Sequence, residues 1–130
     1  MNRCLLIDAD AVSRASLSRY LGCFAFTVRT GASVHDLQRL SHAEPFDIVL
    51  LDLSLPASHD GMDGLALCRW VHEVAGLPLI VMSDPAQAPG RVQALECGAD
   101  DHLCKPCEPR EVVALIRAVL RRLTKGVTPT

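Results

Sequence analysis

The chain has 130 residues, of which 49% are hydrophobic, and this length is typical of one domain with a sizeable buried core. A formal net charge of −2 at pH 7 gives no general attraction to nucleic acid or to anionic lipid. No apolar run approaches the roughly 20 residues of a membrane span, and the apolar start leads into acids instead of a cleavage site. We therefore expect a soluble, cytoplasmic protein without a signal peptide.

Short apolar strands alternate with helical patterns along the whole chain, which indicates an α/β architecture with a parallel sheet. Strands are predicted at 4–7, 24–28, 47–51, 79–82 and 102–104, and helices at 11–21, around 34–40, near 65–74, up to Gly98, and from Pro109 onward. The third strand is apolar on both faces, so we expect it at the centre of the sheet. The pattern fades after residue 123, which predicts one domain at 1–123 and a linker or frayed tail at 124–130.

Polar residues follow the predicted strands at the points where they end. They are Asp8, Asp10, Asp52, Ser83 and Lys105. In an open parallel sheet, ligands bind beyond the carboxyl ends of the strands, so these side chains are expected to meet. Carboxylates that lie close together repel one another unless a cation intervenes, and Mg²⁺ prefers such oxygen ligands. A lysine and a hydroxyl on neighbouring strands can bind phosphoryl oxygens, so the sequence predicts a phosphoryl site with a metal ion.

Several segments carry a family resemblance in the correct order, over about residues 3–122. They are LLIDAD, DIVLLDLSLP, GMDGLAL, PLIVMS and GADDHLCKPCEPREVVALIRAVLRR. The chain resembles the receiver domains of two-component response regulators, most of all the OmpR/PhoB type. The resemblance implies a flavodoxin-like (βα)5 doubly wound parallel sheet with strand order 2-1-3-4-5. It also implies a phosphoprotein of phosphorelay signal transduction and transcription regulation, not an enzyme beyond its own phosphorylation and dephosphorylation.

The same resemblance assigns the chemical roles. Asp52 is the expected phosphoacceptor, Ser83 the hydroxyl that reorients towards the phosphoryl group, and Lys105 its cationic contact, with a cis peptide bond before Pro106. The phosphoryl group is expected from a sensor histidine kinase or a phosphotransfer protein. Ser83 and His102 are the expected switch residues, which shift the face of the fourth helix, fifth strand and fifth helix to control an output or a homodimer. Neither nucleic acid nor membrane is an expected partner of this domain.

Mg²⁺ is the cofactor that the resemblance implies. Its expected ligands are Asp8, Asp52 and the backbone carbonyl of Ser54. The family usually has a second acid directly after the first, and here that position is Ala9, whose methyl group cannot bind metal. Asp10 is a further candidate ligand, although the third position usually points elsewhere in the family. The substitution predicts weakened Mg²⁺ binding.

Two other departures from the family concern the surroundings of the site. Residues 57–60 look like an insertion that lies beside the site and alters access to it. His102 stands where an aromatic residue is usual, and Cys107 replaces the aromatic after the Lys-Pro pair. An imidazole in the switch position predicts a different packing and pH response.

Other functions stay open at this point. A pseudo-receiver, an interaction module without phosphate control, would explain Ala9. A phosphatase of the haloacid-dehalogenase type would use Asp8 as nucleophile and Asp10 as general acid and base, but the order of its later motifs does not fit. Cys104 and Cys107 have the spacing of a redox dithiol or half a zinc site, but they lack a helix start and further metal ligands, so structural roles are expected for them.

Overall fold

The computed structural model describes residues 2–86 and 90–126. The strands are β1 (Asn2–Ile7), β2 (Phe26–Gly31), β3 (Ile48–Asp52), β4 (Leu79–Ser83) and β5 (Asp101–Cys104). The helices are α1 (Ala11–Gly22), α2 (Val34–Ala43), α3 (Gly64–Trp70) with the π-helical turn η1 (Val71–Ala75), α4 (Arg91–Glu96) and α5 (Pro109–Gly126). The described strands and helices alternate, as the sequence predicts.

The strands form one parallel sheet in the order β2-β1-β3-β4-β5, which confirms the expected strand order. All five residues of β3 are buried, in keeping with its central place between β1 and β4. Because all strands run in one direction, their carboxyl ends lie along a single edge. This edge therefore receives every side chain that directly follows a strand.

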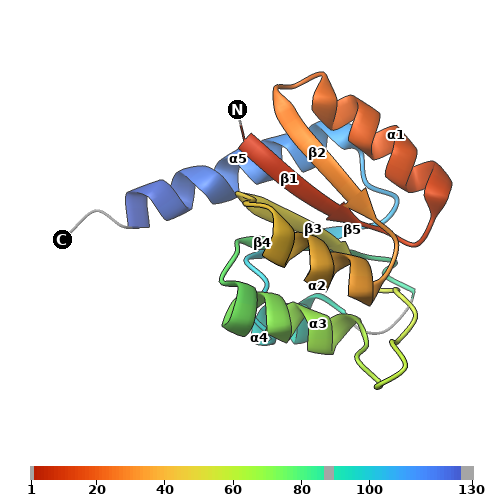
Figure 1. Cartoon of the computed structure of the whole chain (residues 1–130). Coiled ribbons are helices and arrows are strands. Elements are labelled where there is room, and N and C mark those ends of the chain that lie inside the picture. The colour runs from red at the N-terminus through yellow and green to blue at the C-terminus, as the bar shows by residue number, and fades with distance from the viewer. Residues whose placement is uncertain (1, 87–89, 127–130) are drawn as a thin grey trace.

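Helices cover both faces of the sheet, and the alternation of side chains along each strand divides the core in two (Figure 1). On one face Leu5 and Ile7 of β1 pack with buried residues of α2, α3 and α4. On the other face Cys4 and Leu6 pack with α1 and α5. Each strand thus supplies both layers, which is why these segments are almost entirely apolar.

Some element boundaries differ from the prediction. β2 begins at Phe26, two residues late, because Ala25 adopts a positive φ of 66° and turns the chain there. Phe24 stays outside the sheet, where its ring lies 4.9 Å from that of Tyr20. α5 continues to Gly126, three residues past the expected domain boundary. The expected domain and tail include residues 1, 87–89 and 127–130, which lie outside the described part of the chain.

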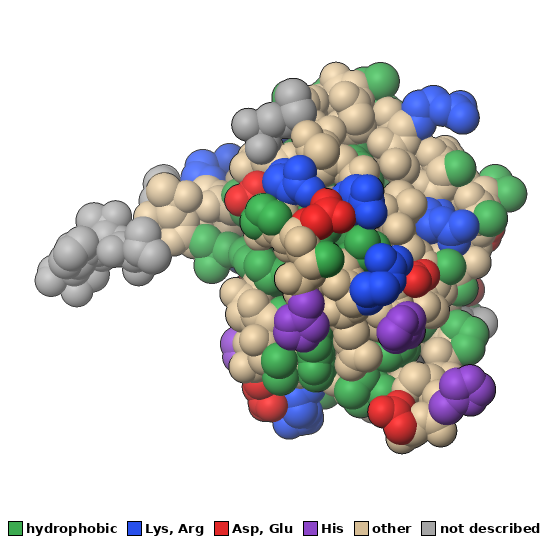
Figure 2. All heavy atoms as spheres, in the orientation of Figure 1, with side chains coloured by type: hydrophobic (Ala, Val, Ile, Leu, Met, Phe, Trp, Pro, Cys, Tyr) green, Lys and Arg blue, Asp and Glu red, His purple; other side chains and the backbone are tan. Residues whose placement is uncertain are grey.

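The helices of the described residues include none that is long and apolar enough to cross a membrane. On the face shown in Figure 2, Lys and Arg side chains are interspersed with Asp and Glu side chains. This mixed surface agrees with the small net charge of the sequence.

Candidate functional site

The buried polar and charged residues of the described chain all lie at one place. They are Asp8, Asp52 and Ser83, with 2%, 3% and 5% of their surface exposed. Asp8 directly follows β1, while Asp52 and Ser83 are the last residues of β3 and β4. The parallel sheet therefore collects them at its carboxyl edge, as the sequence predicts. A buried carboxylate is costly unless it is paired, so the neighbours of these two acids matter.

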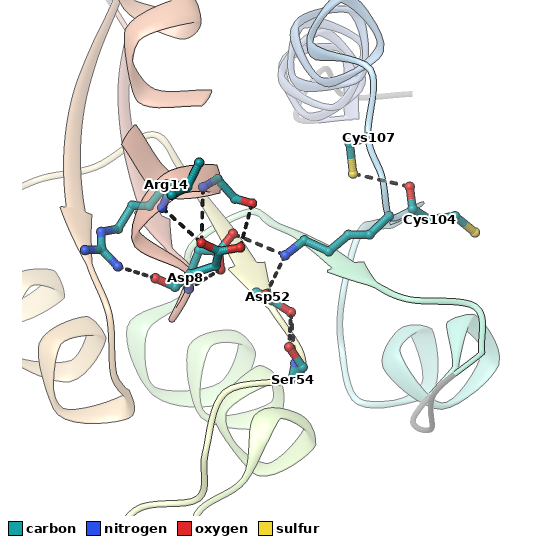
Figure 3. Close-up of polar contacts among 10 residues, drawn as sticks. Asp8, Arg14, Asp52, Ser54, Cys104 and Cys107 are labelled. Atoms are coloured by element: carbon teal, nitrogen blue, oxygen red, sulfur yellow. Dashed lines mark hydrogen bonds and ion pairs between the residues drawn. The ribbon is translucent and has the colours of Figure 1, made fainter. Parts of the chain in front are cut away.

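Lys105 pairs with both buried acids (Figure 3). Its Nζ lies 2.6 Å from Oδ2 of Asp52 and 3.2 Å from Oδ2 of Asp8. The lysine comes directly after β5, and its backbone N–H donates to the carbonyl of Ser83 over 2.8 Å. The expected cis peptide bond between Lys105 and Pro106 is present. One ammonium group thus balances two carboxylates that would otherwise repel each other.

Asp52 is held in its ionised form. Burial pushes its pKa upward, but the hydrogen bonds from Lys105 and Ser54 outweigh burial and hold the pKa below its ordinary value. The Ser54 backbone N–H donates to Oδ1 over 2.9 Å and the Ser54 hydroxyl over 2.8 Å (Figure 3). The pKa of Lys105 is raised: burial lowers it, and the stronger interactions with Asp52 and Asp8 raise it. A carboxylate with this environment is available as a nucleophile at neutral pH.

Asp8 has a different electrostatic environment from Asp52. Burial and the neighbouring Asp52 raise its pKa. The hydrogen bond from the backbone N–H of Asp10 lowers the pKa but offsets only part of this rise. Arg14 donates from Nη1 to the backbone carbonyl of Asp8 over 2.7 Å. The sequence reasoning missed this contact, because Asp8 lies before the helix and accepts through its backbone carbonyl, which its residue type does not reveal. Arg14 fixes the start of the loop that carries Asp8 and Ala9.

Asp10 caps helix α1. Its Oδ1 accepts the backbone N–H of Val12 over 2.9 Å and of Ser13 over 3.5 Å, and its Oδ2 accepts the Ser13 hydroxyl over 3.2 Å. These bonds lower the pKa of Asp10, that from Val12 most. Both carboxylate oxygens are thus engaged with the first turn of the helix. An acid just before a predicted helix is the usual signal for this role, whereas the sequence reasoning considered Asp10 as a metal ligand or as a general acid and base.

The two buried acids open into a cavity of about 560 Å³. Its wall includes Ala9 before α1, Ser13 and Leu17 of α1, and Cys107 from the loop before α5. Residues 57–60 are not among the residues that line the cavity, and the effect of this insertion on access to the site stays a prediction. The loop instead closes on itself, with the N–H of Ser58 donating to the carbonyl of Met62 and the N–H of Met62 donating to the Ser58 hydroxyl. The cavity is large enough for a phosphoryl donor to approach Asp52.

The site offers few groups to a metal ion. The described residues contain no cluster of three or more His, Cys, Asp or Glu that could hold one. Ala9 is exposed on the cavity wall and contributes only a methyl group. Mg²⁺ is commonly held by one or two carboxylates and keeps several water molecules, so Asp8 and Asp52 satisfy its minimum requirement. The residues present therefore fit a weakly bound Mg²⁺ ion.

The remaining predicted site residues also lie near this edge. His102 Nε2 is 2.7 Å from the hydroxyl oxygen of Ser83. All six cysteines are free, and the thiol of Cys107 donates to the backbone carbonyl of Cys104 over 3.3 Å. Burial raises the pKa of Cys107 to about 11, so this thiol is protonated and unreactive at neutral pH. This environment favours a structural role for the Cys-x-x-Cys pair.

Comparison with known proteins identifies the family. Residues 4–117 match the response regulator receiver domain. The chain belongs to this family. Among curated receiver-containing relatives, the transcriptional regulatory protein GltR of Pseudomonas aeruginosa is 38% identical over 121 residues, which are 91% of this chain and 48% of GltR. The transcriptional regulatory protein BaeR of Escherichia coli is 45% identical over 78 residues, which are 60% of this chain and 31% of BaeR.

Solved structures of receiver domains share the fold. The receiver domain of the TMAO respiratory system response regulator TorR superposes with a TM-score of 0.85 at 30% identity, covering 94% of this chain and 98% of that one. The BeF3-activated receiver domain of Klebsiella pneumoniae RstA gives a TM-score of 0.82 at 26% identity, covering 92% and 99%. These matches confirm the flavodoxin-like receiver fold and the OmpR/PhoB-type resemblance. The chain spans about half the length of curated relatives such as GltR. Receiver domains are signalling modules and not classical enzymes.

Proposed function

We propose that this receiver domain is a phosphoryl-accepting switch in which Asp52 takes a phosphoryl group from a phosphohistidine of a sensor kinase or phosphotransfer protein. The observation that supports this role most strongly is the Asp52 carboxylate itself. It is 3% exposed, paired with Lys105 Nζ at 2.6 Å, and open to a cavity of about 560 Å³. Burial with a single cationic partner and an access route is what an acceptor carboxylate requires.

In the transfer step, an Asp52 oxygen attacks phosphorus as the bond between phosphorus and the donor histidine nitrogen breaks. The bonding electron pair returns to the imidazole, which then takes up a proton, and an acyl phosphate forms on Asp52. The Lys105 ammonium lies within hydrogen-bonding distance of Asp52, so it can stabilise the negative charge of the transferred phosphoryl group. Ser83, at the end of the adjacent strand, supplies a hydroxyl to the phosphoryl oxygens.

Mg²⁺ bound at this site would neutralise negative charge on the transferring oxygens. Asp8 and Asp52 are the carboxylates that would hold it, and the backbone carbonyl of Ser54 is the third expected ligand. Asp8 has a raised pKa, so a cation near it also favours its ionised form. We expect phosphorylation to depend on Mg²⁺. Because the site binds Mg²⁺ weakly, a high Mg²⁺ concentration is needed to saturate it.

We infer that phosphorylation acts on the face formed by α4, β5 and α5. Ser83 contacts His102 of β5, so a change at Ser83 is transmitted directly to this face. Val92 of α4 is 67% exposed there and provides apolar surface for a partner, including a second copy of the chain. The names of GltR and BaeR support regulation of transcription as the output of the whole protein.

A second candidate function is that of a pseudo-receiver that works without phosphorylation. Two neighbouring residues, Ala9 and Asp10, favour it because neither offers a free ligand atom to a metal ion. The former has no ligand atom, and the latter uses both carboxylate oxygens to cap α1. Such a protein would keep the fold and the partner surface while binding no Mg²⁺.

Phosphorylation by a small donor distinguishes these functions. The protein is incubated with Mg²⁺ and acetyl phosphate, and the intact mass is recorded for wild type, Asp52→Asn and Asp8→Asn. We expect one added phosphoryl group in wild type and none in Asp52→Asn. No adduct together with no Mg²⁺ binding would favour the pseudo-receiver. Turnover of a generic phosphomonoester that is lost in Asp8→Asn but kept in Asp52→Asn would instead restore the phosphatase interpretation.

A further inference from the structure

Ser83 and His102 form a side-chain pair on neighbouring strands at the edge of the site. Ser83 Oγ lies 2.7 Å from His102 Nε2, and Ser83 is 5% exposed. The ladder between β4 and β5 places His102 opposite Val81 and Ser83 opposite Cys104. The imidazole therefore meets the hydroxyl diagonally, on the same face of the sheet.

The backbone leaves the Ser83 side chain little freedom except its own rotation. The Ser83 carbonyl accepts the N–H of Lys105 over 2.8 Å on one side. On the other side, the neighbouring Met82 carbonyl accepts the N–H of Leu53 over 2.9 Å. Ser83 is thus fixed between the strand that ends in Asp52 and the segment that carries Lys105. What remains variable is the direction of its hydroxyl.

The protonation state of the imidazole decides what this hydroxyl can do. A serine hydroxyl has one proton to donate and oxygen lone pairs to accept. In the neutral tautomer with its proton on Nδ1, His102 accepts the serine proton at Nε2, whereas an imidazolium can only donate. When His102 is charged, Ser83 Oγ must be the acceptor, and the serine proton is free for another acceptor.

We propose that His102 is a positioning residue for Ser83: in its neutral form it retains the serine hydroxyl proton, and in its charged form it releases that proton towards a phosphoryl group on Asp52. The inference rests on the proposed phosphorylation of Asp52 and adds a regulation of the same site. Proton binding at His102 and phosphoryl binding at Asp52 thereby favour each other, because coupling between two sites is reciprocal.

Burial, with a smaller contribution from a neighbouring positive charge, lowers the pKa of His102 and favours the neutral imidazole in the resting domain. Burial lowers its pKa most, Arg91 of α4 lowers it further, and Asp101 beside it in β5 acts in the opposite sense. Arg122 of α5 lies 3.3 Å from the Asp101 carboxylate and weakens that opposing effect. Asp84, after β4, is exposed to solvent. The two negative charges of a phosphoryl group on Asp52 would favour the imidazolium, so phosphorylation itself promotes the release.

Beryllofluoride affinity as a function of pH tests this proposal. It is measured with excess Mg²⁺ between about pH 5.5 and pH 8, the range in which a histidine changes charge. In wild type we expect binding about tenfold tighter at the low end, the effect of one hydrogen bond to a charged group. His102→Gln, which keeps hydrogen-bonding capacity but cannot titrate, should give a flat profile. Ser83→Ala should also flatten the profile while His102 still titrates by NMR.

The outcomes separate this inference from the proposed function. A His102→Gln variant with the wild-type pH profile would overturn the inference alone, because binding itself would be intact. Equal weakening of binding at every pH in His102→Gln would also overturn it, since that result indicates a packing role. Absence of beryllofluoride binding at every pH in wild type and in both variants would overturn the proposed function, and the inference with it.

Discussion

At the scale of single residues, the chemistry depends on how few charges the site contains. Asp8 and Asp52 share one lysine, Lys105. Ala9, between Asp8 and Asp10, carries only a methyl group. A bound metal ion and Lys105 would therefore share the same two carboxylates. Changing one charge at a time measures how this sharing is balanced.

Ala9→Asp should strengthen Mg²⁺ binding. Ala9 is exposed on the cavity wall, so an aspartate fits there and adds a third carboxylate to a site that has two. We expect at least about a tenfold gain in affinity, which corresponds to about 1.4 kcal/mol. Isothermal titration calorimetry measures it. Ala11→Asp is the charge-matched control outside the cavity wall, and an equal gain in both variants would show a general charge effect instead of a ligand.

Lys105→Met should destabilise the fold in a pH-dependent manner. Without the ammonium, burial and mutual repulsion raise the carboxyl pKa values above those of the unfolded chain. The loss of stability, about 3 kcal/mol at neutral pH, is then fully present above the raised values and disappears as the pH falls and the acids protonate. Urea unfolding at several pH values measures this trend. The double variant with Asp8→Asn should recover much of the loss, and no recovery would contradict the charge-sharing argument.

At the scale of elements, two contacts at helix starts orient the loops around the site. Asp10 caps α1, and the backbone of Gly64 at the start of α3 packs against the carbonyl of Leu53, leaving no room for a Cβ atom. Both contacts connect a helix to the carboxyl edge of the sheet. Each can be removed separately.

Asp10→Ala should lower the melting temperature by a few degrees without weakening Mg²⁺ binding, because the carboxylate caps a helix. Asp10→Ser is the matched control, since serine is also a good cap. Thermal unfolding and calorimetric Mg²⁺ titration measure the two effects. A marked loss of Mg²⁺ affinity in both variants would instead make Asp10 a metal ligand.

Gly64→Ala should cost about 2 kcal/mol or more, because the new methyl group meets the Leu53 backbone, which cannot move as a side chain does. Gly22→Ala, at the end of α1, has open space around it and should be neutral or slightly stabilising. Denaturant unfolding compares them. Equal effects in the two variants would exclude the proposed steric cause.

The sequence could predict the alternation of elements because each strand is apolar along both faces. It predicted which residues share the carboxyl edge for the same topological reason. It missed the start of β2, where the positive φ of Ala25 cannot be read from the residue type. The Asp10 cap and the contact between Ser83 and His102 depend on side-chain rotation, which the spacing of residues leaves open.

At the scale of the whole molecule, the proposed phosphoryl site and the proposed partner surface are separate regions joined by β4 and β5. The site lies beyond the strand ends, and the face of α4, β5 and α5 lies beside it. Asp101 and Arg122 already pair with each other across this face at 3.3 Å. A partner chain must therefore form new contacts around an existing ion pair.

Activation should convert the domain from monomer to dimer through this face. We expect beryllofluoride with Mg²⁺ to double the mass measured by light scattering. Val92→Glu should prevent the change, because it places a charge in an apolar contact, while folding is unaffected since Val92 is 67% exposed. Val74→Glu, at a position 59% exposed in η1, should still dimerise. Loss of dimerisation in both variants, or in neither, would place the interface elsewhere.

Helix α5 extends past the end of the sheet, as Figure 1 shows, and runs for 18 residues, or about 27 Å at 1.5 Å per residue. Its last turns would set the orientation of a segment joined to them. Any segment joined to it would inherit both its direction and its angular phase. Because one residue advances a helix by about 100°, a single insertion between Val119 and Leu123 would swing such a segment to another side of the molecule while shifting it by only about 1.5 Å.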